Sequence, residues 1–225
     1  MTFRSMLVAF LMAPLAAAAQ APETLFNLVT LSAQAEREVP NDLLSAVLAA
    51  EAEGTDPAQL ANEVNSAMQR ALATAKSYRA VNARSGGYQT FPVYDKNRIA
   101  RWRARQELRL ESADFAAATE LIGKLQAGLV VAGMTLSVSP EANRKAENAL
   151  IPEALAAFDE RARLVRDAAK AKGYRMRDLN LSGSGPNRQT FAMARSSAAQ
   201  SMAAPAVEPG TTRIVITVSG TIQLQ

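Results

Sequence analysis

The chain has 225 residues and contains neither histidine nor cysteine. These two absences exclude zinc sites built from Cys and His, Ser-His-Asp and Cys-His catalysis, thiol redox chemistry and disulfide bonds. The 25 basic and 21 acidic residues give a formal net charge of +4, and 48% of the residues are hydrophobic. A chain of this length and composition can bury a sizeable core, so we expect a soluble globular protein of one domain or two small subdomains.

The N-terminal segment 1–19 has the features of a signal peptide. Arg4 supplies positive charge, and an apolar stretch of about 14 residues follows it, which is short for a membrane span but typical of a signal-peptide core. Two A-x-A cleavage sites are readable, one ending at Ala19 and one ending two residues later. The later site would leave Pro22 as the first residue, which signal peptidase accepts poorly, so we expect cleavage after Ala19. The mature protein, residues 20–225, is then expected in the periplasm or secreted, without a transmembrane span; a retained amphipathic or buried helix is the alternative.

Side-chain alternation and turn residues predict the first elements of the mature chain. Residues 25–39 alternate between apolar and polar, which is the period of a half-buried strand. Pro40-Asn41-Asp42 has turn chemistry and 43–52 reads as the return strand, so we expect these strands to pair as a hairpin. Gly54-Thr55-Asp56-Pro57 then predicts a helix start capped by Thr55 or Asp56, and apolar residues recur at helical spacing as far as Tyr78.

A second hairpin and a second helix follow in the pattern. The strands of this hairpin are expected at 88–94 and 99–112, and the helix at 114–127. Within the helix, Glu120 precedes Lys124 by four residues, a spacing that favours an ion pair.

The C-terminal half is predicted to hold one long helical region and three strands. The helical region, 140–172, is expected to break near Ile151 and Pro152, because a proline inside a helix lacks the N–H donor and clashes with the preceding turn. The segment 185–210 is rich in Ser, Ala, Gly, Pro and Met without any period, and is expected to be a flexible loop. The strands are expected at 129–138, 176–182 and 212–224.

The order of these elements predicts the fold class. Hairpins joined by helices indicate an α+β fold, in which an antiparallel β-sheet built from hairpins carries helices packed on one face. The expected order is β-hairpin, helix, β-hairpin, helix, strand, long helix, strand, strand. The two hairpin-and-helix units suggest an internal duplication.

Several segments, taken together in their order and spacing, resemble one known family. They are Ser32 to Glu36 with Val39 to Asp42, Asp56-Pro57-Ala58, Tyr88 to Asp95 with Trp102 to Leu108, Asp159 to Gly173, and Val218 to Leu224. Over nearly all of 25–225 the chain resembles the SIMPL-domain family, the YggE-like group that includes periplasmic immunogenic proteins. The resemblance implies an exported protein of largely unknown biochemistry, associated with envelope stress, in a family where some members form ring-like or channel-like oligomers. It implies no catalytic residues.

The predicted strand at 99–112 sorts its side chains cleanly by parity. Apolar side chains, including Trp102, share one face, and the opposite face carries Arg101, Arg103, Arg105 and Arg109. This arginine face is a candidate binding surface for anionic lipid, lipopolysaccharide phosphates or a nucleic acid. The alternative is a solvated face with cross-strand ion pairs, which the alternating Glu107 and Glu111 favour. Trp102 points away from the arginines and the chain is exported, so we expect no nucleic-acid partner.

Other chemical candidates are weaker. Asp159 and Glu160 diverge by about 100° on a helix, and Asp159 has Arg163 four residues on, so a surface ion pair is expected there rather than an acid–base pair. Met193 and Met202, without His or Cys, are too few to predict a soft-metal site. We expect no catalytic residue, no metal and no cofactor.

The sequence therefore favours a non-enzymatic protein. We expect an exported SIMPL-domain protein that forms homo-oligomers, contacts envelope proteins and takes part in envelope maintenance or stress protection. The alternative is a module that binds an anionic envelope component, such as an anionic lipid surface, or a small ligand. A hydrolase that uses carboxylates alone would need two of them converging in a cleft.

Overall fold

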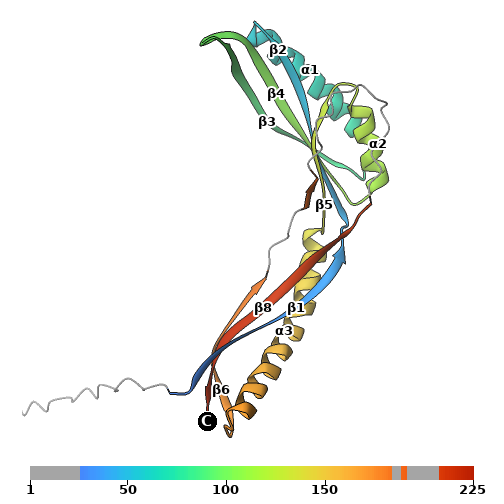
Figure 1. The fold of residues 1–225 in the computed structure, drawn as a ribbon. Coiled ribbons are helices and arrows are strands. Elements are labelled where there is room, and N and C mark those ends of the chain that lie inside the picture. Colours follow the sequence, from blue (N-terminus) through green and yellow to red (C-terminus); the bar gives the residue numbers. More distant parts are fainter. Residues whose placement is uncertain (1–25, 184–188, 192–207) are drawn as a thin grey trace, which may run out of the picture.

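The computed structural model describes residues 26–183, 189–191 and 208–225. The predicted signal peptide, Met193 and Met202 lie outside the described residues, as does most of the predicted loop at 185–210. The described chain folds into two antiparallel sheets that lie towards opposite ends of an elongated molecule (Figure 1). Each sheet carries its helices on one face, so the predicted α+β class with antiparallel strands is confirmed.

The smaller sheet has three strands in the order β1-β8-β6. β1 (Leu28–Pro40) pairs along its whole length with β8 (Thr211–Leu224), and β6 (Tyr174–Gly183) pairs with the other side of β8. The long helix α3 (Pro140–Ala168) packs on β1 and β8 and runs along the sheet in Figure 1. Their shared core contains Ala146, Leu150, Ala154, Phe158 and Ala162 of α3 and Ile214, Ile216, Val218 and Ile222 of β8.

The larger sheet has five strands in the order β3-β4-β2-β5-β7. In that order they are β3 (Asn82–Asp95), β4 (Arg98–Ser112), β2 (Leu43–Gly54), β5 (Val130–Ser137) and β7 (Gln189–Phe191). The predicted second hairpin is confirmed as β3 and β4, and β7 falls within the segment predicted to be a loop.

Two helices cover one face of the five-stranded sheet. Asp56 caps α1 (Pro57–Ala75) by accepting hydrogen bonds from the main-chain N–H groups of the first turn, and Asp114 caps α2 (Phe115–Leu125) in the same way. The apolar stripe predicted for the first helix is buried against the sheet and comprises Leu60, Val64, Met68, Ala71 and Ala75.

The hairpin predicted for 25–39 and 43–52 is wrong. β1 and β2 are consecutive in the chain but belong to different sheets. The residues between them do not close a turn on themselves: the main-chain N–H of Asn41 donates to the Gly210 carbonyl oxygen, and that of Asp42 donates to the Ser137 carbonyl oxygen, both at 3.1 Å. The chain therefore passes from one sheet into the other at this point.

Polar side chains fasten this passage. Asn41 Nδ2 donates to the Pro209 carbonyl oxygen at 2.7 Å, and Asn41 Oδ1 accepts from Thr212 Oγ1 at 2.6 Å. Asp42 accepts hydrogen bonds from the main-chain N–H and from Oγ of Ser139, at 2.5 and 2.8 Å. The entry into β8 and the start of α3 are thus tied to the link between the two sheets.

The break predicted near Ile151 and Pro152 is also wrong, because α3 is one helix of 29 residues with Pro152 inside it. Pro152 is exposed, and so is Asn148, whose carbonyl would have accepted the missing hydrogen bond. Water can satisfy a carbonyl on this outer side. The buried stripe on the opposite side is continuous from Ala146 to Ala162 and holds both halves of the helix on the sheet.

Candidate functional site

The uncovered face of the five-stranded sheet carries the four arginines predicted from the sequence. Their apolar neighbours on β4, including Ala104 and Leu108, are buried under the helices. The arginines therefore point to the other face, as predicted, and are Arg101, Arg103, Arg105 and Arg109.

Glutamates from the same face pair with these arginines. The strand register sets Glu53 of β2 opposite Arg103 and Glu51 opposite Arg105. Glu53 Oε1 lies 2.7 Å from Arg101 Nε, Glu53 Oε2 lies 3.1 Å from Arg103 Nη2, and Glu51 Oε1 lies 2.5 Å from Arg105 Nη1. The cross-strand ion pairs that the sequence offered as the alternative are therefore present.

The ion pairs continue along β4 towards its C-terminal end. Glu107 lies 3.5 Å from Arg105 and 3.3 Å from Arg109, while Glu111 lies 3.1 Å from Arg84 of β3. Together these residues form a ladder of alternating charge across three strands, which we call the charge ladder. It contains five arginines and four glutamates, so its net charge is small: Arg84, Arg101, Arg103, Arg105, Arg109, Glu51, Glu53, Glu107 and Glu111.

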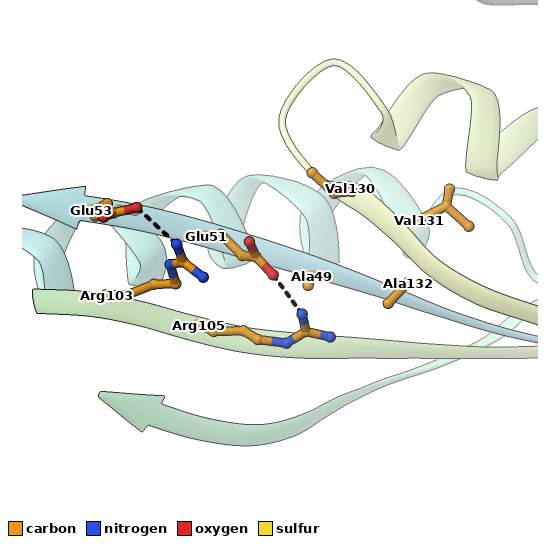
Figure 2. A pocket seen from close by; sticks show the side chains of 9 residues that line it. Ala49, Glu51, Glu53, Arg103, Arg105, Val130, Val131 and Ala132 are labelled. Carbon is orange, nitrogen blue, oxygen red and sulfur yellow. Dashed lines mark hydrogen bonds and ion pairs between the residues drawn. The ribbon is translucent and has the colours of Figure 1, made fainter. Parts of the chain in front are cut away.

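A pocket of about 630 Å³ opens beside one part of the charge ladder. Figure 2 shows the two ion pairs Glu53–Arg103 and Glu51–Arg105 along one side and β5 on the other. The pocket is lined by Ala49, Glu51, Ala52, Glu53, Arg103, Arg105, Val130, Val131 and Ala132. Its volume lies within the range of small-ligand sites, roughly 300–1,000 Å³.

A β-bulge explains why the pocket exists. Val47 of β2 is opposite Gly133, but the next residue, Leu48, is opposite Val131, so Ala132 is an extra residue on β5. Such a bulge bends the strand that carries it and breaks the regular pairing. The pairing of β5 with β2 ends at Ala49, and the pocket lies beyond this point.

Two simple kinds of chemical site can be checked against the described residues: a cluster of acidic metal ligands and a free pair of carboxylates in the pocket. No group of three or more Asp or Glu residues in the described ranges is placed to hold a metal ion. The two carboxylates in the pocket, Glu51 and Glu53, are each ion-paired with arginine. They are therefore not a free pair of the kind that carboxylate hydrolysis needs.

Two clusters of tyrosine, carboxylate and cation lie elsewhere on the surface. In the first, Glu120 Oε1 accepts from the Tyr78 hydroxyl at 2.8 Å and from Lys124 Nζ at 2.9 Å. Lys124 Nζ also lies 5.1 Å from the centre of the Tyr78 ring, within the range of a cation–π contact. The hydrogen bonds from Lys124 and Tyr78 hold the pKa of Glu120 below its ordinary value. The ion pair predicted at this spacing is confirmed. The contacts of Tyr78 with Glu120 and Lys124 join α2 to the segment after α1.

The second cluster joins α3 to β6. Asp159 accepts a hydrogen bond from the Tyr174 hydroxyl and lies 2.5 Å from Arg163 Nη2. The hydrogen bond to Asp159 and burial raise the pKa of Tyr174. The predicted pair of Asp159 with Arg163 is confirmed. The hydrogen bond from Tyr174 to Asp159 anchors the C-terminal part of α3 to the start of β6.

The strand β6 forms an exposed edge of the three-stranded sheet. Met176, Leu179 and Leu181 are opposite Ile222, Gly220 and Val218, so they point towards the face that α3 covers. α3 lies over β1 and β8, however, and these three side chains stay 44%, 38% and 41% exposed. We call this row the β6 edge.

A close approach holds β6 against β8. The pairing of the two strands shifts between Met176 and Asp178, where Arg177 is the extra residue. A Cβ at Gly220 would collide with the Asp178 carbonyl oxygen. Glycine is therefore required at this point of β8, and the bulged strand can lie directly over it.

Comparison with known families matches the chain to the SIMPL family, described as "Protein of unknown function (DUF541)", over residues 29–222. The chain belongs to the SIMPL family. No curated protein matches the chain. The family assignment confirms the resemblance found in the sequence and, by its own description, adds no activity. None of the helices in the described ranges is long and apolar enough to span a membrane.

The structure places the predicted arginines together but also shows partners that the sequence did not indicate. Glu51 and Glu53 were not among the predicted site residues, because strand 43–52 was assigned to a different neighbour. Their alternate spacing, two positions apart at the end of a strand, was the available signal.

Proposed function

We propose that this SIMPL-family protein is exported, is not an enzyme, and acts in the cell envelope by self-assembly and contacts with other envelope proteins. The observation that carries the assembly is the β6 edge. An edge strand with exposed apolar side chains is a template for pairing with another chain. Among the described strands, β6 has a neighbour on one side only, which is β8.

Pairing of β6 with β6 of a second copy would account for the unpaired main-chain groups of this edge and for its exposed apolar side chains. A two-fold contact would join two three-stranded sheets into one and would satisfy the free main-chain groups of both edges. In an antiparallel pairing centred on Leu179, it would also bring the exposed Leu179 of each copy opposite Leu179 of the other, with Leu181 diagonal to that contact. With Leu179 at the centre of an antiparallel pairing, Arg175 and Arg177 are opposite uncharged residues, so like charges do not meet.

Size measurement tests this proposal directly. We expect light scattering of residues 20–225 to show an oligomer that dissociates in the double variant Leu179→Lys/Leu181→Lys. The control is Leu164→Lys, which introduces one lysine at a side chain that is 63% exposed on α3. The control should keep the oligomer. A wild-type protein that stays monomeric at all concentrations, or a control that dissociates equally, overturns assembly through the β6 edge.

The alternative function is binding of an anionic envelope component by the arginine face. The side chains of Arg101 and Arg109 are 59% and 64% exposed, which favours this function, whereas the glutamates of the charge ladder oppose it. Reversal of Arg101, Arg103 and Arg105 to Glu should abolish binding to vesicles that contain anionic lipid. Unchanged binding of the reversed variant rejects this alternative.

A further inference from the structure

The strand β2 is paired on both sides along only part of its length. β4 pairs with β2 as far as Gly54, whereas β5 pairs with it only as far as Ala49. The segment 50–54 therefore has no strand neighbour on the β5 side in the part of the chain that the structure describes. On such an edge, alternate residues present a free N–H and a free C=O. A segment of this length matches a common β-strand of about five residues.

The pocket opens onto this free edge. Ala52 belongs to the core under the helices, and Val131 packs against the same core, so their side chains point away from the charged face. Both residues nevertheless line the pocket. Because its lining includes residues of both β2 and β5 whose side chains point to either face of the sheet, the pocket lies where β2 and β5 separate as well as on the charged face (Figure 2).

The charge ladder predicts which side chains a new strand should carry. Across the sheet, one row runs Glu51–Arg105 and the next row runs Glu53–Arg103. A strand added on the free side would place alternate side chains directly opposite the two glutamates. Like charges in that position are destabilising and opposite charges are stabilising. A carboxylate has about four acceptor positions, so Glu51 can accept an ammonium group beside Arg105, and Glu53 can accept one beside Arg101 and Arg103.

The remaining positions of such a strand favour apolar side chains. The residue between the two basic ones would point to the other face of the sheet, on the side of Ala52 and the helices. On the charged face, Val130 is opposite Ala49, is 62% exposed and offers an apolar contact to the methylene groups of a basic side chain. The pattern basic–apolar–basic thus fits both faces at once.

We propose that the gap between β2 and β5 binds an extended peptide segment of another protein as an added strand. The segment carries basic residues at alternate positions, opposite Glu51 and Glu53, with an apolar residue between them. This site is independent of the β6 edge, which lies in the other sheet.

Fluorescence anisotropy with short labelled peptides tests the site. The acetylated and amidated peptide Thr-Lys-Val-Lys-Thr should bind, and Thr-Glu-Val-Glu-Thr should not. Two further peptides carry main-chain N-methyl groups. The first is methylated at valine, and the second is methylated at both lysines. Because only alternate residues of an added strand donate towards β2, one of these two should bind at least about tenfold more weakly while the other binds nearly as well as the parent. Equal binding of the acidic peptide, or no loss with either methylated peptide, overturns the proposal.

Protein variants locate the binding. The double variant Glu51→Gln/Glu53→Gln should weaken binding of the basic peptide about tenfold or more. The matched control Glu111→Gln removes a carboxylate of the same charge ladder, paired at 3.1 Å with Arg84, outside the pocket. It should bind the peptide as the wild type does, and equal loss in the control overturns the site. Repeating the titration with Leu179→Lys/Leu181→Lys should give the same affinity, so failure of assembly and failure of peptide binding are distinguished.

Discussion

The side chain of Asn41 is expected to fasten the two sheets to each other, and replacing it with alanine measures how strongly. Asn41 and Thr212 are each only 6% exposed, and Thr212 donates to Asn41 at 2.6 Å. Asn41 also donates to the Pro209 carbonyl oxygen at 2.7 Å. The variant Asn41→Ala removes the partner of both groups. Thr212 is buried, and a buried polar group left without a partner costs about 1–3 kcal/mol. Pro209 is exposed, so the loss of its hydrogen bond costs only about 0.5–1.5 kcal/mol. The two together predict a loss of roughly 2–4 kcal/mol in the free energy of unfolding.

Thermal and urea unfolding measure this loss. For a chain of this size each kcal/mol lowers the melting temperature by about 2–4 °C, so we expect a decrease of roughly 5–15 °C. Thr212→Val breaks the same hydrogen bond from its other end, and the double variant should therefore cost less than the sum of the single variants by about 1 kcal/mol. The control Gln69→Ala, on the exposed side of α1, should stay within about 0.5 kcal/mol of the wild type. Full additivity, or an Asn41→Ala variant as stable as this control, would refute the role assigned to Asn41.

Two further predictions concern the helices. Because hydrogen bonds from Lys124 and Tyr78 lower the pKa of Glu120 from 4.5, its contribution to stability is present above that value and is lost as the pH falls through the folded-state pKa. Urea unfolding between about pH 5 and about pH 3 should show a smaller loss of stability for Glu120→Gln than for the wild type, and identical curves contradict this. Pro152→Ala restores the N–H donor for the Asn148 carbonyl and should raise the free energy of unfolding by about 1–3 kcal/mol. A lower melting temperature of this variant contradicts the explanation given for the unbroken helix.

Local patterns predicted the elements well wherever one face is buried and the other is not. In β8, Ile214, Ile216 and Val218 alternate with partly exposed residues, and the sequence alone placed this strand and its buried face. The capping role of Asp56 and the stripe after it were equally readable, because a cap and a helical period are properties of neighbouring residues. Where helix propensity met tertiary packing, as at Pro152, packing prevailed.

Which strands lie next to each other in the sheets was harder to predict from the sequence. Alternation shows which face of a strand is buried but does not show which strand lies beside it. Pro40-Asn41-Asp42 has the composition of a hairpin turn, yet Asn41 and Asp42 form their hydrogen bonds with Gly210, Ser137 and other residues that are distant in the chain. Those partners are far away in the chain, so no local pattern indicates them.

The candidate site shows how strand register and charge depend on each other. The arginines of β4 were predicted from their own strand, but Glu51 and Glu53 meet them only in the observed register of β2. A shift of β2 by one residue would turn both glutamates towards the core under α1, where an unpaired buried charge is costly. It would also leave the arginines without these partners. The largely apolar run Leu43–Ala50 specifies its register weakly by itself. The ion pairs of the charge ladder favour the observed register of this central strand. Because β5 is short, the end of β2 stays unpaired on that side and borders the pocket.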